Sequence, residues 1–208
     1  MHRVIEEIQI GNEWREKEFA KFKANQKGVD ETLWCRMCTP MIYAHWEGFA
    51  KNSLEVMLKH LNSLNLCSEA VNTKILVYSL GDAYKPLSGK QAFMQRLQFT
   101  DAFKEKIFNT VSVPSKVNTK SNLSIKVLRE LCSIFDFDES KLEAIAPDIT
   151  RLVKIRNSIA HGENSFVLNQ ENLNKYITAV QTAIDYLTNE IEVFITNEKY
   201  MKLPIVNP

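Results

Sequence analysis

Arg156 and His161 are the residues of this chain whose types and spacing best suit chemistry on an anion. They lie five residues apart in segment 148–162, which ends Arg-Asn-Ser-Ile-Ala-His-Gly. Residues three and four apart are neighbours on a helix, so the neighbours of Arg156 are Leu152, Val153, Ile159 and Ala160. Burying a guanidinium among such side chains costs free energy unless an acid pairs with it or an anion binds it. We therefore expect Arg156 to meet an acidic side chain or a phosphate.

A polar stripe runs along the same segment beside the aliphatic one. By helical spacing its members are Arg151, Lys154, Ser158 and His161. Arg156 does not face the same way as His161, although Asn157 lies between them. An imidazole titrates near neutral pH and can transfer protons, and a guanidinium can hold a phosphate. The sequence therefore predicts a phosphate-handling set on one helix.

Glu47 is a carboxylate in a stretch with apolar residues on nearly every side, Leu33 to Leu58. One interpretation is that Glu47 orients Arg156 or assists proton transfer. The other is an intrahelical ion pair with Lys51, four residues further on. The sequence leaves both open.

The other aromatic and histidine side chains of this stretch are better explained by packing. Apolar residues flank His45, so we expect a core histidine with one hydrogen bond. Trp34 and Trp46 are expected in the core rather than as platforms for nucleobases. Cys35 and Cys38 form a C-x-x-C pair that lacks two further ligands, which favours two buried thiols over a zinc or redox site.

Composition narrows the class of protein. The net charge is +1 over 208 residues and 45% of the residues are hydrophobic, so the chain has a core but no global field that attracts nucleic acid. Six Gly and six Pro are few for an all-β fold. No apolar run is long enough to span a bilayer, and the N-terminus lacks the apolar core of a signal peptide. We expect a cytoplasmic protein without membrane contact.

Hydrophobic periodicity and capping residues predict a single all-α domain, a helical bundle. It comprises an extra N-terminal helix within 1–27, a core bundle over 30–197 and a loose tail over 198–208. The expected helices are Glu6–Lys23, Glu31–Asn62 (capped by Asp30 and bent at Pro40), Glu69–Leu80, Lys90–Thr110, Leu123–Phe135, Pro147–Gly162 and Glu171–Asn197.

The last of these helices carries a heptad of apolar residues. Its members are Leu173, Val180, Leu187 and Phe194. Such a face needs a partner helix, either within this chain or in a coiled coil with another chain. Packing within the chain is the favoured interpretation.

Three segments of the chain resemble the HEPN family. The segment Arg156–His161 matches the R-x4-H form of its motif, including the polar Asn157 after the arginine. The segments Ile42–Lys51 and Asn118–Leu123 are similar to a bacterial branch of that family. The resemblance covers about residues 30 to 195 and does not include the N-terminal helix.

This resemblance implies a dimeric helical bundle that cuts single-stranded RNA without a metal or other cofactor. Arg156, Asn157 and His161 would be catalytic, with Glu47 and Lys51 supporting them. We expect Arg151, Lys154 and Ser158 to contact the RNA. The partner would be a second copy or a related HEPN protein, together with a possible antitoxin or regulatory protein. Many such proteins are toxins or phage-defence effectors; the alternative is a non-catalytic interaction module that binds a partner protein.

Overall fold

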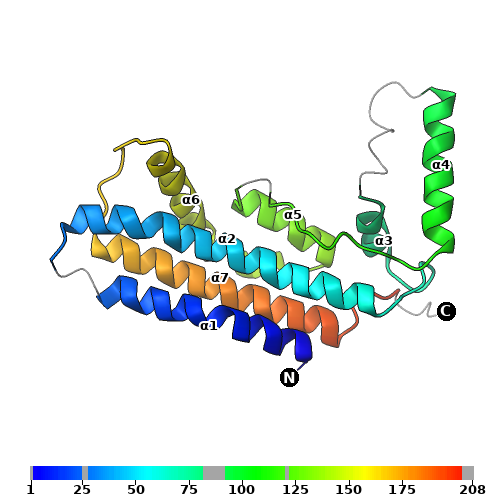
Figure 1. Ribbon diagram of the computed structural model, residues 1–208, viewed down its shortest axis with the longest axis horizontal. Coiled ribbons are helices and arrows are strands. Elements are labelled where there is room, and N and C mark those ends of the chain that lie inside the picture. Colours follow the sequence, from blue (N-terminus) through cyan, green and yellow to red (C-terminus); the bar gives the residue numbers. More distant parts are fainter. Residues whose placement is uncertain (1, 25–27, 82–91, 120–121, 203–208) are drawn as a thin grey trace.

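The computed structural model describes residues 2–24, 28–81, 92–119 and 122–202. Within these ranges the regular elements are seven α-helices and one short 3₁₀ helix, and the only β pairing is two isolated bridges (Figure 1). In chain order the elements are α1 (Arg3–Ala24), α2 (Glu31–Ser63), α3 (Thr73–Leu80), α4 (Phe93–Phe108), α5 (Ile125–Phe135), η2 (Glu139–Leu142), α6 (Ala146–Ala160) and α7 (Gln170–Thr196). The predicted all-α fold class is confirmed.

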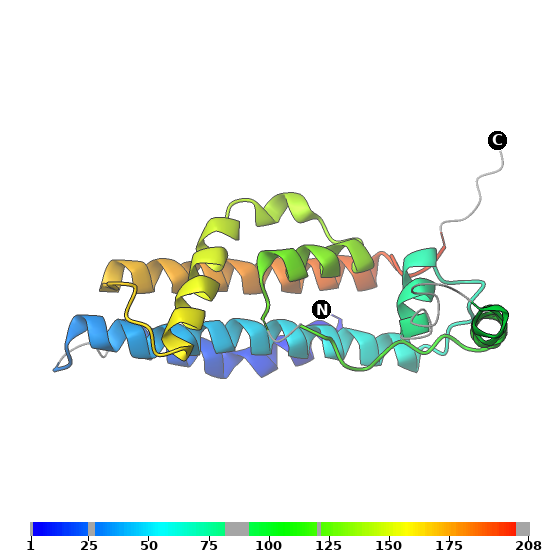
Figure 2. The same cartoon turned by 90° about the horizontal axis from the view of Figure 1, so that it is seen from above.

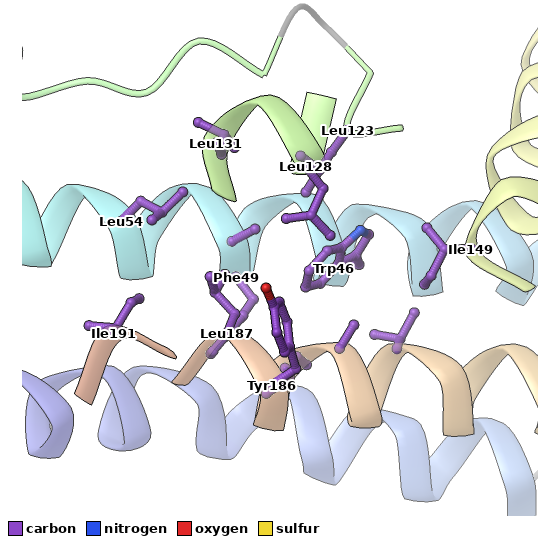
Figure 3. Packing of buried hydrophobic residues seen from close by; sticks show 14 of the residues in the cluster. Trp46, Phe49, Leu54, Leu123, Leu128, Leu131, Ile149, Tyr186, Leu187 and Ile191 are labelled. Atoms are coloured by element: carbon purple, nitrogen blue, oxygen red, sulfur yellow. The ribbon is translucent and has the colours of Figure 1, made fainter. Parts of the chain in front are cut away.

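The three long helices α1, α2 and α7 pack together along their lengths (Figures 1 and 2). Helix α2 is central and is covered by α1 and α7 and by α6, so side chains on most of its faces are buried. In Figure 3, Trp46, Phe49 and Leu54 of α2 lie among side chains from several elements, namely Leu123, Leu128, Leu131, Ile149, Tyr186, Leu187 and Ile191. Trp46 is fully buried and Trp34 packs against the core, as predicted.

The heptad face of α7 packs inside this chain. Leu173, Val180, Leu187 and Phe194 are all buried, and α7 contacts α1, α2 and α6. The interpretation that this face is ordinary core packing is confirmed.

Helix α1 also contributes to the core rather than standing apart from it. Its residues Ile5, Ile8 and Phe19 are each about 1% exposed. His45 of α2 packs edge-on against Phe19, and its Nε2 lies 2.7 Å from Glu18 Oε2. The prediction of a core histidine with one hydrogen bond is confirmed.

Local capping sets most helix ends. Asp30 accepts a hydrogen bond from the Leu33 amide, as predicted, and α2 continues through Pro40. The third helix begins at Thr73 and not at Glu69, because Asn72 caps it and Val71 is held in a bridge with Met201. The fifth begins at Ile125 and not at Leu123, because the Ser124 hydroxyl accepts from the Val127 amide. Helix η2 was not predicted.

Helix α4 lies at one end of the bundle, away from the long helices (Figures 1 and 2). Its first residues, Phe93 and Met94, are 68% and 58% exposed. The predicted start of this helix at Lys90, like most of the predicted loose tail, lies outside the described residues.

Cys35 and Cys38 are both buried as free thiols on α2. Burial raises the pKa of Cys38 to about 11. No group of three or more His, Cys, Asp and Glu side chains suited to a metal ion occurs in the described ranges. A search of those ranges also finds no helix with the length and hydropathy needed to cross a membrane.

Candidate functional site

Helix α6 carries the Arg-x4-His segment and is fixed by its apolar face. Ile149, Leu152 and Ile155 are fully buried, and α6 contacts α2, α5 and α7. In Figure 2, α6 runs crosswise to α2 and α7. The opposite face, which includes Arg151 and Lys154, is exposed. The amphipathic pattern therefore decides which side chains of α6 meet the core and which meet solvent.

The Arg156 side chain is half-buried and lies on an aromatic ring. Its guanidinium carbon is 4.7 Å from the centroid of the Tyr43 ring of α2. Its Nη1 donates a hydrogen bond of 2.9 Å to Asn157 Oδ1. Among the described residues, no carboxylate oxygen lies within 4.0 Å of an Arg156 nitrogen. The acidic partner that the sequence allowed for Arg156 is therefore absent from the described part of the chain.

Tyr43 connects this site to the segment before α5. Its hydroxyl accepts a hydrogen bond of 2.8 Å from the Leu123 amide and donates one of 3.1 Å to Asn122 Oδ1. Burial raises the pKa of Tyr43 to about 12, and the nearby Glu47 carboxylate adds to this rise, whereas the Leu123 hydrogen bond and the Arg156 charge oppose it. The phenol is thus neutral at physiological pH, and its ring is a fixed support for the guanidinium.

Glu47 lies one helical turn after Tyr43 and also contacts a loop. Its Oε1 accepts a hydrogen bond of 2.9 Å from the Thr119 hydroxyl. The structure places neither Arg156 nor Lys51 within ion-pair distance of Glu47. The ion pair with Lys51 is therefore not formed, whereas a supporting role of Glu47 toward Arg156 stays a prediction. The contact with Thr119 joins residues 72 positions apart, so no local pattern in the sequence indicates it.

His161 ends α6 in an exposed position. The turn after it is a Schellman motif, in which the Gly162 amide donates to the Ile159 carbonyl and the Glu163 amide to the Ser158 carbonyl. Gly162 has φ +75°, a conformation that favours glycine. The imidazole is therefore presented to solvent from a well-defined helix end.

Two hydrogen-bonded side chains hold the loop that follows His161. Ser158, which is buried, donates from its hydroxyl to Glu163 Oε2 at 2.9 Å. Arg36 of α2 donates from Nη1 to Asn164 Oδ1 and from Nη2 to the Glu163 carbonyl, both at 2.9 Å. Ser158, predicted to contact RNA, is thus engaged within the chain. Arg36 was not predicted from the sequence, although a basic residue in the apolar stretch of α2 is a signal for such a contact.

The two basic residues of the predicted stripe differ in their surroundings. The Arg151 guanidinium lies 4.6 Å from the centroid of the Phe166 ring. Burial raises the pKa of Tyr176, and a hydrogen bond with Arg151 counteracts this effect. Lys154 is exposed one turn nearer to His161. Lys51 is exposed as well and lines a separate pocket between α1 and α2.

Within one chain, Arg156 and His161 do not converge. Five residues of an α-helix correspond to about 140° of rotation and about 7.5 Å of rise. Arg156 faces α2 and Tyr43, whereas His161 is exposed at the helix end. This agrees with the prediction that the two side chains point in different directions.

Comparison with known proteins identifies the family. A family model described as RiboL-PSP-HEPN matches residues 11–193, which include most of α1, all of α2 to α6 and most of α7. No curated protein and no solved structure matches the chain. The match includes the Arg-x4-His segment, Tyr43 and Arg36. It also extends into α1, so the expectation that the resemblance does not include the N-terminal helix was wrong. The chain therefore belongs to the RiboL-PSP-HEPN family of HEPN proteins.

Proposed function

We propose that this protein is a metal-independent endoribonuclease that cleaves single-stranded RNA, with Arg156, Asn157 and His161 as catalytic residues. HEPN domains are commonly ribonucleases. The observation that carries the proposal is the Arg156 guanidinium, which is held by a ring and an amide and has no carboxylate within 4.0 Å among the described residues. A positioned cation without an acidic partner is suited to bind a phosphate.

The reaction is an intramolecular transesterification. The 2′-oxygen forms a bond to the adjacent phosphorus while the bond from phosphorus to the 5′-oxygen breaks. One proton leaves the 2′-hydroxyl and one is supplied to the 5′-oxygen, so the products carry a 2′,3′-cyclic phosphate and a 5′-hydroxyl. Histidine is the side chain that most often performs such proton transfers, and we assign them to His161.

Arg156 would stabilise the negative charge that develops on the phosphorane-like transition state. The Tyr43 ring and Asn157 Oδ1 restrict the guanidinium before RNA binds, so little reorganisation is needed during the reaction. Asn157 would orient Arg156 or the scissile phosphate.

A second protomer would complete the site. Since the two catalytic side chains of one chain face different directions, His161 of one protomer could act beside Arg156 of another. The partner would be a second copy or a related HEPN protein. Arg151 and Lys154, both exposed on α6, would contact the RNA backbone at the edge of such a cleft.

We place this activity in a toxin or phage-defence system of the bacterial branch, in which an antitoxin or regulatory partner would control it. Gly162, Glu163 and Asn164 follow the motif, so the chain lacks a Tyr at that point for silencing by nucleotidyl transfer.

The test is cleavage of a single-stranded RNA by the purified protein in EDTA. We expect fragments with 2′,3′-cyclic phosphate and 5′-hydroxyl ends, and loss of cleavage in His161→Ala with an unchanged circular dichroism spectrum. Undiminished cleavage by His161→Ala, or products with 5′-phosphate ends, would refute the mechanism.

The second candidate is a non-catalytic interaction module. The observation in its favour is the stacking of Arg156 on Tyr43, which would stabilise the fold even if Arg156 bound no phosphate. In that case Arg156→Ala lowers stability and the wild type never cleaves RNA. The partner would have to bind elsewhere than on the heptad face of α7, which is buried.

A further inference from the structure

Arg15 of α1 is a buried cation far from the Arg-x4-His segment in sequence. It is 7% exposed, and burial lowers its pKa. Its Nη1 donates to the Gly11 carbonyl at 2.8 Å, and its guanidinium carbon lies 4.6 Å from the centroid of the Trp14 ring. Its Nε is buried without a hydrogen-bond partner, and no carboxylate of the described residues lies within 4.0 Å of its nitrogens. A buried guanidinium with an unused donor is costly unless an anion binds it.

The Arg15 side chain borders an open pocket of about 430 Å³ between α1 and α2. The lining residues are Gly11, Trp14, Arg15, Gly48, Lys51, Asn52 and Glu55. Two of them are glycines that leave room in the wall. A Cβ at Gly48 would lie 3.5 Å from Arg15 Nη2, and one at Gly11 would lie 3.6 Å from Asn52 Nδ2.

The pocket lining combines positively charged hydrogen-bond donors with one acidic acceptor, which suits a ligand that carries both a phosphate and a hydroxyl group. Arg15, Lys51 and Asn52 supply donors and two positive charges, which suit a phosphate group. Glu55 lines the same pocket, and its Oε1 is buried without a hydrogen-bond partner. A carboxylate oxygen accepts hydrogen bonds from hydroxyl groups. The volume lies within the range of small-molecule sites, about 300–1,000 Å³, and exceeds what a bare phosphate needs.

We propose that the α1–α2 pocket binds a hydroxyl-bearing phosphate ester, with the phosphate on Arg15, Lys51 and Asn52 and a hydroxyl on Glu55. The ester is either a small sugar phosphate or a ribose phosphate of an RNA strand. The pocket contains none of Tyr43, Arg156, Asn157 and His161, so binding of a small ester there does not depend on the nuclease proposal.

The test is calorimetric titration with ribose 5-phosphate, inorganic phosphate and a short single-stranded RNA, the last with the His161→Ala protein. Two variants probe the pocket. Gly48→Leu fills it from α2, and Lys51→Ala removes an exposed cation whose loss does not disturb the core. Lys17→Ala, an exposed lysine of α1 outside the pocket, is the matched control.

We expect wild-type protein and Lys17→Ala to bind the ester equally. Lys51→Ala should bind about tenfold more weakly, since a charged hydrogen bond contributes about 1.5 kcal/mol or more. Gly48→Leu should not bind. If ribose 5-phosphate binds and its affinity depends on Lys51 and Gly48, the ligand is a small sugar phosphate. If only the RNA binds with this dependence, the ligand is a ribose phosphate of the RNA strand.

Three results would overturn the proposal. They are no binding of either ester at millimolar concentration, equal binding by Gly48→Leu and wild type, and inorganic phosphate binding as tightly as ribose 5-phosphate. Arg15→Met, which retains much of the side-chain volume, provides a further arm and should also lose binding. Failure here leaves RNA cleavage unaffected, and loss of cleavage would leave ester binding unaffected, so the two proposals fail separately.

Discussion

The guanidinium carbon of Arg156 on α6 lies 4.7 Å from the centroid of the Tyr43 ring on α2, and the same tyrosine hydroxyl holds the segment before α5. One aromatic side chain therefore positions the cation and fixes a neighbouring loop. The consequence is that perturbing the ring, the hydroxyl and the cation should have separable effects.

Replacement of Arg156 tests the cation. Arg156→Ala should reduce the rate of RNA cleavage by about 10²–10³-fold, the typical cost of losing one group that stabilises transition-state charge. Its cost in stability should be about 0.5–2 kcal/mol, the range for a cation on an aromatic ring. Arg156→Lys retains the charge without the planar fork, so it should recover stability more than activity. Cleavage kinetics and urea denaturation measure both. If Arg156→Lys lost as much stability as Arg156→Ala, or recovered activity as fully as stability, this role of Arg156 would be contradicted.

Tyr43→Phe tests the hydroxyl while retaining the ring. It leaves the buried Leu123 amide without its acceptor, which should lower the free energy of unfolding by about 1–3 kcal/mol. Because the ring remains under Arg156, cleavage should fall less than in Arg156→Ala. Tyr78→Phe, which removes a phenol hydroxyl from a ring packed on Phe135, is the control for stability. A Tyr43→Phe protein as stable as wild type would show that this hydrogen bond contributes little.

Gly162→Ala tests the turn that presents His161. At φ +75° a side chain is strained, so we expect a loss of about 1 kcal/mol and a reduced cleavage rate. Gly48→Ala is the matched control for stability. That glycine is inside α2, and its added Cβ would make only an ordinary contact, so alanine should be tolerated there. Thermal denaturation measures the stability of both variants, and cleavage assays measure the activity of Gly162→Ala. A Gly162→Ala protein with wild-type stability and activity would show that the left-handed conformation does not require glycine.

Arg36→Ala tests the contact between α2 and the loop after His161. Loss of the hydrogen bonds to Glu163 and Asn164 should increase amide hydrogen exchange over residues 162–166 and lower the rate of cleavage, by about tenfold as an estimate for one lost charged interaction. The global free energy of unfolding should change little, because this contact is exposed. Arg129→Ala, which removes the exposed pair with Glu143, should change neither loop exchange nor cleavage. Unaltered exchange in Arg36→Ala would mean that the loop is held by other contacts.

His45 should make stability depend on pH. Burial lowers its pKa more than the hydrogen bond to Glu18 raises it, and the Arg15 charge lowers it further. The unfolded chain therefore takes up a proton at a higher pH than the native protein does. Stability is complete above the unfolded pKa, about 6.5, and is lost as pH falls below that value. Denaturant titrations at pH 7.5 and 5.5 should show a smaller difference in His45→Gln than in wild type. The remainder would include His60, whose pKa burial also lowers. An identical pH dependence in the two proteins would contradict this assignment.

Much of the architecture follows from local sequence patterns. The apolar residues around α2, the heptad of α7 and the caps at Asp30 and Gly162 act over one or two helical turns, and all are visible in the sequence. The separation of Arg156 from His161 around α6 is likewise a property of helical geometry. These features determined the all-α class, the principal helices and the segment proposed for chemistry.

Only the tertiary structure decided which groups meet. Three contacts join residues far apart in the chain. They are the stacking of Arg156 on Tyr43, the hydrogen bond from Thr119 to Glu47 and the hydrogen bond from Arg36 to Asn164. The same holds for the pocket beside Arg15, which is lined by residues of α1 and α2. The physical reason is that a hydrophobic pattern specifies which face of a helix is buried, whereas the partner of a polar side chain depends on how the packed helices are placed.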